Sequence, residues 1–127
     1  NFVKTMMRLM KEKESINVVS DQVGSPTYAA DLALAIMRII KSKKSKLNPG
    51  IYHYTNAGIT NWYEFAVAIK KITGSNCAVH PITTAQYPTA AKRPAYSVLD
   101  TTKIAATFPV AVPDWEDSLR KCLNLLK

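Results

Sequence analysis

The chain has 127 residues, the length of one domain rather than two. Hydrophobic residues make up 47% of it, which is enough to form a buried core and excludes disorder as the dominant state. Seventeen lysines and arginines against nine aspartates and glutamates give a formal net charge of +8. That excess favours an anionic partner, and net charge alone does not choose among nucleic acid, an acidic membrane surface and a phosphorylated small molecule.

The cysteine and hydropathy patterns exclude several further classes. Cys77 and Cys122 lie far apart and have no metal-ligand spacing, so neither a disulfide framework nor a zinc site is expected. We expect the protein to work in a reducing, cytoplasmic setting. No apolar run approaches the roughly 18 residues of a membrane span, and no secretory signal is visible. Because the chain starts at Asn1 and enters a helical pattern at once, we expect residues 1–127 to be one domain cut from a longer protein.

The amino-terminal part predicts a helix, a strand, a turn and a second helix. Helical spacing of apolar residues covers 2–13, with Asn1 as the capping residue, and the β-branched run at 16–20 predicts a strand. Residues 21–27 are rich in turn formers and lead into a helix at 29–42. The apolar face of this second helix is broad, so it is predicted to be well buried.

The remaining part alternates helices and short strands, so the fold class is mixed α/β with short strands. The pattern predicts strands at 51–54 and 77–82 and helices at 62–73, 101–108 and 115–126. Asn61 and Asp114 stand at the capping positions of the helices at 62–73 and 115–126. Trp62 and Trp115, in first helical turns on the apolar stripe, are predicted to pack in the core rather than stack on a ligand.

Two segments are candidates for binding. The first is 22–27, between a strand and a helix start, where free backbone N–H groups suit an anion, although a plain connection explains it almost as well. The second is the long irregular stretch 83–98, where Arg93 lies between Tyr87 and Tyr96. Its guanidinium fork suits a phosphate while a ring covers a base or sugar, and a solvated loop charge is the alternative. The lysines at 41–46 are interpreted as a solvated helix end.

Residues for catalysis or cofactor binding are not apparent. The four glycines stand singly, so neither a dinucleotide fingerprint nor a P-loop is present. His53 and His80 lie beside no nucleophile with an orienting acid, and the carboxylates near Asp114 are explained by helix capping. We therefore expect no catalytic, cofactor-binding or metal-binding residue in this chain.

Several motifs occur in a fixed order along nearly the whole chain. They are NFVKTM (1–6), VVSDQVGSPTYAADLA (18–33), GIYHYTN (50–56), TNWYEFA (60–66), YPTAAKRPAYSVLD (87–100) and VPDWEDSL (112–119). Together they resemble the carboxyl-terminal, substrate-binding part of the extended short-chain dehydrogenase/reductase family, and most of all the members that reduce a dTDP-linked deoxysugar to dTDP-L-rhamnose.

The resemblance implies a division of labour. In that family an amino-terminal Rossmann half binds NADPH or NADH, and a Tyr-x-x-x-Lys pair protonates the sugar oxygen as hydride arrives. No tyrosine of this chain is followed by lysine at that spacing. The resemblance therefore implies that the Rossmann half is absent, that no cofactor binds to this chain alone, and that the chain alone is inactive.

The resemblance also implies partners and site residues. Gln22, Pro26 and Thr27 are expected to line the sugar, Asn1 to lie near the phosphates, and Arg93 to clamp the diphosphate of a dTDP-sugar substrate. The missing Rossmann half is an expected partner and a homodimer is possible, whereas no nucleic acid or membrane partner is expected. The alternatives are another nucleotide-sugar reductase or epimerase of the family, or a noncatalytic binding or regulatory module.

Overall fold

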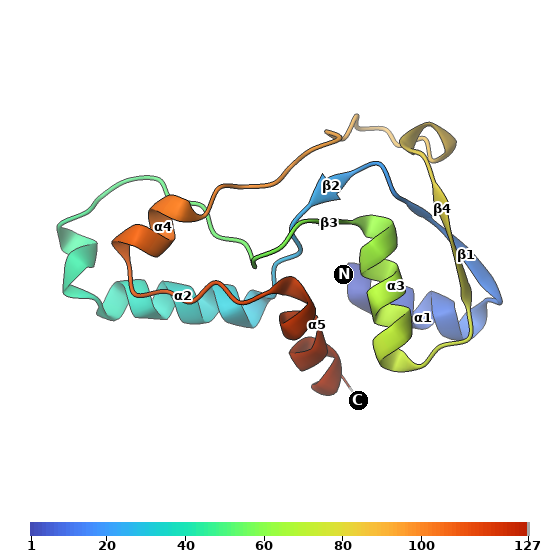
Figure 1. The fold of residues 1–127 in the computed structure, drawn as a ribbon, viewed down its shortest axis with the longest axis horizontal. Helices are drawn as coiled ribbons and strands as arrows, with labels where there is room; N and C mark the ends of the chain where they lie inside the picture. Colours follow the sequence, from blue (N-terminus) through green and yellow to red (C-terminus); the bar gives the residue numbers. More distant parts are fainter. Residues whose placement is uncertain (127) are drawn as a thin grey trace.

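The computed structural model describes residues 1–126, and its helices and short strands form an elongated molecule (Figure 1). The α-helices are α1 (Phe2–Glu12), α2 (Ala29–Lys41), α3 (Trp62–Thr73), α4 (Thr102–Thr107) and α5 (Trp115–Asn124). The strands are β1 (Ser15–Val19), β2 (Val23–Gly24), β3 (Thr60–Asn61) and β4 (Ala78–Ile82). Two 3-10 helices, η1 (Lys43–Lys46) and η2 (Thr84–Gln86), follow α2 and β4. Among the residues described, no helix is long and apolar enough to cross a membrane.

The strands form two small sheets. β1 pairs in parallel with β4 from Ser15 opposite Ala78 to Val19 opposite Ile82, and β2 pairs antiparallel with β3. The predicted strands at 16–20 and 77–82 are confirmed, as are all five predicted helices, whose observed ends differ by a few residues at most. The sequence pattern did not predict β2 and β3, because two-residue strands are too short to show a hydrophobic period.

The strand predicted at 51–54 is wrong, since this stretch pairs with no other described segment and runs as irregular chain. The Tyr52 ring instead meets Phe108 edge-on, with 5.0 Å between the ring centroids. The Nζ atom of Lys103 lies 4.5 Å from the centroid of the same ring and donates a hydrogen bond to the Ile51 carbonyl. Tyr52, one of the aromatic residues that suggested a strand, therefore packs this segment against α4 and the residue that follows it.

The core lies at the end of the molecule that holds α1, α3, α5 and the β1–β4 pair (Figure 1). Its most buried members come from α3 and α5, where Ala66, Ile69 and Leu123 are fully enclosed. The Asn61 side chain caps α3 by accepting a 2.9 Å hydrogen bond from the Glu64 N–H, as predicted. The start of α3 is therefore anchored by its cap and by the burial of the helix in the core.

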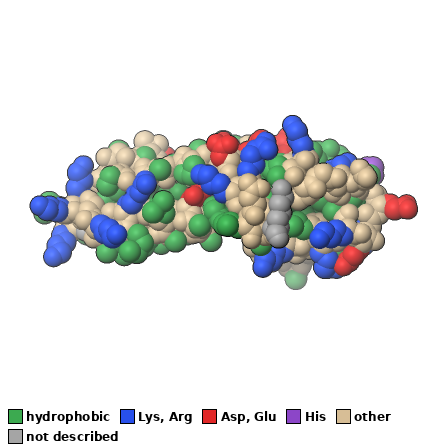
Figure 2. Space-filling view, turned by 90° about the horizontal axis from the view of Figure 1, so that it is seen from below, with side chains coloured by type: hydrophobic (Ala, Val, Ile, Leu, Met, Phe, Trp, Pro, Cys, Tyr) green, Lys and Arg blue, Asp and Glu red, His purple; other side chains and the backbone are tan. Residues whose placement is uncertain are grey.

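The helix α2 departs from expectation, because only Ala35 on it is buried. Its apolar side chains Leu34, Ile36, Met37 and Ile40 are between 47% and 65% exposed. The reason is that α2 extends away from the core, toward the end of the molecule that holds η1 and α4 (Figure 1). Figure 2 shows hydrophobic side chains spread over this narrow lobe among lysines and arginines. The prediction of a well-buried helix is therefore wrong for this chain.

A buried amide ties α2 to the rest of the molecule. Asn56 is 1% exposed, and its Oδ1 accepts a 2.7 Å hydrogen bond from the Tyr28 N–H just before α2. Its Nδ2 donates to the Asp31 carboxylate at 2.8 Å, to the Ser118 hydroxyl of α5 at 2.9 Å and to the Pro113 carbonyl at 3.1 Å. This network fixes where the chain turns into α2, and with it the segment that precedes that helix.

Candidate functional site

The irregular stretch after η2 is held against β2 by backbone pairing. The Val23 N–H donates to the Ala95 carbonyl at 2.8 Å, and the Ser97 N–H donates to the Val23 carbonyl at 2.9 Å. Val23 and Tyr96 form a parallel bridge. A Cβ on Gly24 would come within 2.9 Å of the Ser97 hydroxyl, so a larger residue here would displace that hydroxyl. The segment that carries Arg93 thus lies beside β2 (Figure 1).

A second tether holds the other end of the same stretch. The Asp21 carboxylate accepts hydrogen bonds from the Thr84 N–H at 2.9 Å and from the Thr84 hydroxyl at 2.7 Å, and Gln22 donates to that hydroxyl at 3.1 Å. The side-chain and then the backbone hydrogen bond from Thr84 lower the pKa of Asp21. The hydrogen bonds from Thr84 to the Asp21 carboxylate therefore stabilise the fold fully above the ordinary pKa of aspartate. This stabilisation is lost as the pH falls through the lower pKa that Asp21 has in the folded state.

A cleft of about 330 Å³ lies between β2, β3, the start of α3 and this tethered stretch. Its walls combine apolar and small polar side chains with one guanidinium. The lining residues are Gln22, Val23, Gly24, Ser25, Pro26, Thr55, Thr60, Asn61, Trp62, Phe65, Arg93, Pro94, Ser97 and Leu99. In the part of the chain that the structure describes, the ion pairs do not involve Arg93, so its charge is open to a ligand.

The structure brings three of the five predicted site residues together. Gln22, Pro26 and Arg93 all line the cleft. Thr27 is outside the lining set, and its hydroxyl lies 3.5 Å from the Ser25 carbonyl, to which it donates. Asn1 is also outside it, and its Oδ1 caps α1 by accepting from a backbone N–H at 3.4 Å. The cleft therefore joins two segments that are about 70 positions apart in the sequence.

The start of α2 differs from the open anion site that the 22–27 segment suggested. The Tyr28 N–H donates to Asn56, and the first turn of the helix carries the Asp31 carboxylate. A helix N-terminus that already has a carboxylate in its first turn is poorly suited to a second anion. Among the described residues that line the cleft, Arg93 is the one that carries a positive charge.

The prediction from sequence missed several lining residues, among them Asn61, Trp62 and Ser97. Trp115 is 9% exposed and lies in the core as predicted, whereas Trp62 is 37% exposed and lines the cleft. The pairing of Val23 with Asn61 places the start of α3 there. The only local signal near Trp62 is the helix cap at Asn61, and a cap does not indicate what the side chain of the next residue faces.

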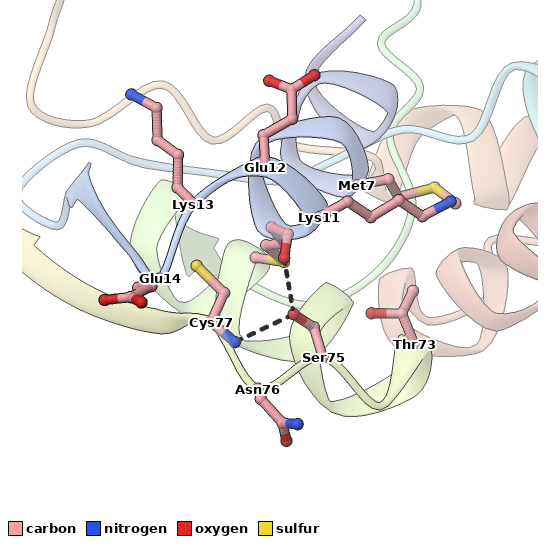
Figure 3. A pocket seen from close by; sticks show the side chains of 10 residues that line it. Met7, Lys11, Glu12, Lys13, Glu14, Thr73, Ser75, Asn76 and Cys77 are labelled. Atoms are coloured by element: carbon pink, nitrogen blue, oxygen red, sulfur yellow. Dashed lines mark hydrogen bonds between the residues drawn. The ribbon is translucent and has the colours of Figure 1, made fainter.

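A larger cavity of about 570 Å³ lies elsewhere, between the end of α1, the start of β1 and the link from α3 to β4 (Figure 3). Figure 3 shows Ser75 in its wall, where the Ser75 hydroxyl donates to the Met10 carbonyl and accepts from the Cys77 N–H. The charged residues of its rim alternate in sign along 11–14, so the cavity favours neither anions nor cations. It contains none of the predicted site residues.

The residues of this chain do not fit a nicotinamide dinucleotide. Such a site needs a glycine-rich turn between a strand and a helix, where backbone N–H groups approach the pyrophosphate. The glycines Gly24, Gly50, Gly58 and Gly74 stand singly, and Gly24 is packed against Ser97. We assign no cofactor-binding residue to this chain.

The match of this chain to a family model and to solved structures places it in a class, the carboxyl-terminal substrate-binding portion of the extended short-chain dehydrogenase/reductases. Residues 1–127 match the model of the family described as the RmlD substrate binding domain, and the chain belongs to that family. The resemblance found in the sequence motifs and the predicted fold class are both confirmed.

Three known proteins illustrate the relationship. The chain is 43% identical over 128 residues to a dTDP-4-dehydrorhamnose reductase of Aggregatibacter actinomycetemcomitans, covering 94% of this chain and 44% of that protein. A crystal structure of a dTDP-4-dehydrorhamnose reductase from Clostridium acetobutylicum matches with a TM-score of 0.91 and 42% identity over 99% of this chain and 44% of that one. One from Bacillus anthracis, in complex with NADP, matches with a TM-score of 0.90 and 39% identity over 98% and 43%. The chain thus spans less than half the length of these relatives.

Proposed function

We propose that this chain is the nucleotide-sugar-binding portion of a longer dTDP-4-dehydrorhamnose reductase that uses NADPH or NADH and makes dTDP-L-rhamnose. The observation that carries the proposal is the cleft in which Val23 holds the Arg93 segment beside Gln22 and Pro26. This arrangement occurs in a chain that matches the substrate binding domain from end to end. The relatives named as dTDP-4-dehydrorhamnose reductases support the identity of the sugar nucleotide.

Each side chain of the cleft has a chemical task under this proposal. The planar guanidinium of Arg93 donates paired hydrogen bonds to the diphosphate, for which a fixed fork is better suited than a flexible amine. Gln22 offers its amide oxygen to a sugar hydroxyl, since its Nε2 is already committed to Thr84. Pro26 and Leu99 supply apolar contact. The roles of Thr27 on the sugar side and of Asn1 near the phosphates stay predictions.

Hydride transfer and proton donation belong, under this proposal, to the remainder of the polypeptide. Its docking surface on this chain is the exposed apolar side of α2, with Leu34, Ile36, Met37 and Ile40. Isolated copies of the chain can cover the same surface by forming a homodimer. A reductase that draws on nucleotide sugars and NADPH works in the cytoplasm, as the cysteine pattern predicts.

The binding function is tested by titrating the chain with dTDP and, in parallel, with UDP in a calorimeter. We expect saturable binding of one dTDP per chain and weaker binding of UDP, with no NADPH oxidation when dTDP-4-dehydrorhamnose is added. Absence of dTDP binding contradicts the proposal. Tighter binding of UDP favours another nucleotide-sugar enzyme of the family, and NADPH oxidation by the chain alone contradicts the division of labour.

A further inference from the structure

The indole of Trp62 forms part of the cleft wall although it belongs to the first turn of α3. It is 37% exposed, and the ring of Phe2 packs against it with 4.8 Å between the centroids. Trp115, the second tryptophan of the chain, is 9% exposed and packs edge-on against Phe65 at 5.6 Å. Only Trp62 therefore presents indole surface to the cleft.

The position of this indole is fixed before any ligand arrives. Asn61 pairs with Val23 across the β2–β3 sheet and caps α3 through its side chain, with 2.9 Å between its Oδ1 and the Glu64 backbone nitrogen. The Thr60 hydroxyl donates to the Glu64 carboxylate at 3.2 Å. An aromatic side chain on a rigid element loses little conformational freedom when it binds a ligand, so little of the binding free energy is lost to ordering.

The chemistry around Trp62 suits a ligand that has both a flat ring and an anion. Val23, Pro26 and Leu99 supply further apolar wall, and Arg93 supplies the cation in the same cleft. Aromatic side chains stack on nucleobases because both have planar π-faces. The thymine base is the planar ring of a dTDP-sugar.

We propose that Trp62 is the stacking surface for the thymine base of the bound nucleotide, while Arg93 holds the diphosphate. This inference rests on the proposed function and adds the orientation of the ligand. The base packs toward the start of α3, and the diphosphate lies beside Arg93 in the same cleft. Trp62 then contributes to the affinity for the nucleoside and not to the affinity for the diphosphate.

Tryptophan fluorescence and two variants test this. Because Trp115 is buried, addition of dTDP is expected to quench the emission of Trp62 alone, and the quenching should disappear in Trp62→Phe. Trp62→Leu, which keeps apolar contact with Phe2, is expected to weaken dTDP binding about tenfold. Its affinity for inorganic pyrophosphate should stay unchanged, and Trp62→Phe should restore most of the affinity for dTDP.

The outcomes separate the inference from the proposed function. If dTDP binds the native chain without quenching Trp62, or if Trp62→Leu weakens dTDP and pyrophosphate equally, the stacking role is overturned and the substrate-binding function stands. If dTDP does not bind the native chain, both are overturned. Circular dichroism of each variant, with Trp115→Phe as the matched tryptophan replacement away from the cleft, shows that the fold is intact.

Discussion

Replacement of Asn56 by alanine is expected to lower the free energy of unfolding by about 3 kcal/mol. The substitution removes the partner of the Tyr28 N–H and of the Ser118 hydroxyl, which is 1% exposed. Each buried polar group left without a hydrogen bond costs about 1–3 kcal/mol of stability. The loss of stability is partly offset, because the half-buried Asp31 carboxylate still accepts the 2.5 Å hydrogen bond from the Ser118 hydroxyl. Denaturation by urea, followed by circular dichroism, measures the change.

Two further variants make this experiment specific. Asn76→Ala removes the same amide from an exposed position, and its effect is expected to stay within about 0.5 kcal/mol. Asn56→Asp keeps the shape but places a second carboxylate next to Asp31, so it should destabilise the fold more at neutral pH than near pH 3. A loss below about 1 kcal/mol for Asn56→Ala would show that the network does not hold α2 in place.

Reversal of the charge at Arg93 is expected to reduce the affinity of the chain for dTDP by about 100-fold or more. The substitution Arg93→Glu removes charge-assisted hydrogen bonds to the diphosphate and adds repulsion in a cleft that no other described lysine or arginine lines. Arg93→Lys should give an intermediate loss, because a single ammonium cannot form the paired hydrogen bonds of a guanidinium. Calorimetric titration measures all three proteins.

Lys92→Glu is the matched control for Arg93→Glu. It changes the net charge by the same amount one position away, and Lys92 is exposed and does not line the cleft. We expect at most a few-fold loss of affinity, which should shrink as salt is added, since long-range attraction between exposed charges is screened. If both variants weaken binding equally, the effect is one of net charge and the assignment of a diphosphate clamp to Arg93 is wrong.

Local signals were sufficient for the helices and for one pair of strands. Asn61 and Asp114 mark helix starts by their capping side chains, and Gly74 marks a helix end because its φ of +69° suits glycine. The branched residues of β1 indicate a strand because they suit a pleated, buried surface. These features depend on neighbouring residues only, which is why the pattern predicts them.

The candidate site depends on contacts that no local pattern encodes. The pairing of Val23 with Asn61 on one side and with the 95–97 segment on the other creates the cleft, and each partner strand is too short to be recognised. Arg93 and Gln22 were connected by family resemblance, whereas Trp62 was missed because an apolar stripe does not distinguish a core position from a cleft wall. The exposure of α2 was also missed, since hydrophobic periodicity indicates which face needs a partner and not whether that partner belongs to the chain.

Binding of dTDP between β2, β3 and the Arg93 segment is tested most directly by a chemical-shift map of the titrated chain. We predict that the largest backbone amide shifts on addition of dTDP fall on Val23, Gly24, Asn61, Arg93 and Ser97. Shifts concentrated instead at Ser75 and Cys77, beside the larger cavity of Figure 3, would contradict the account. So would a spectrum that dTDP leaves unchanged.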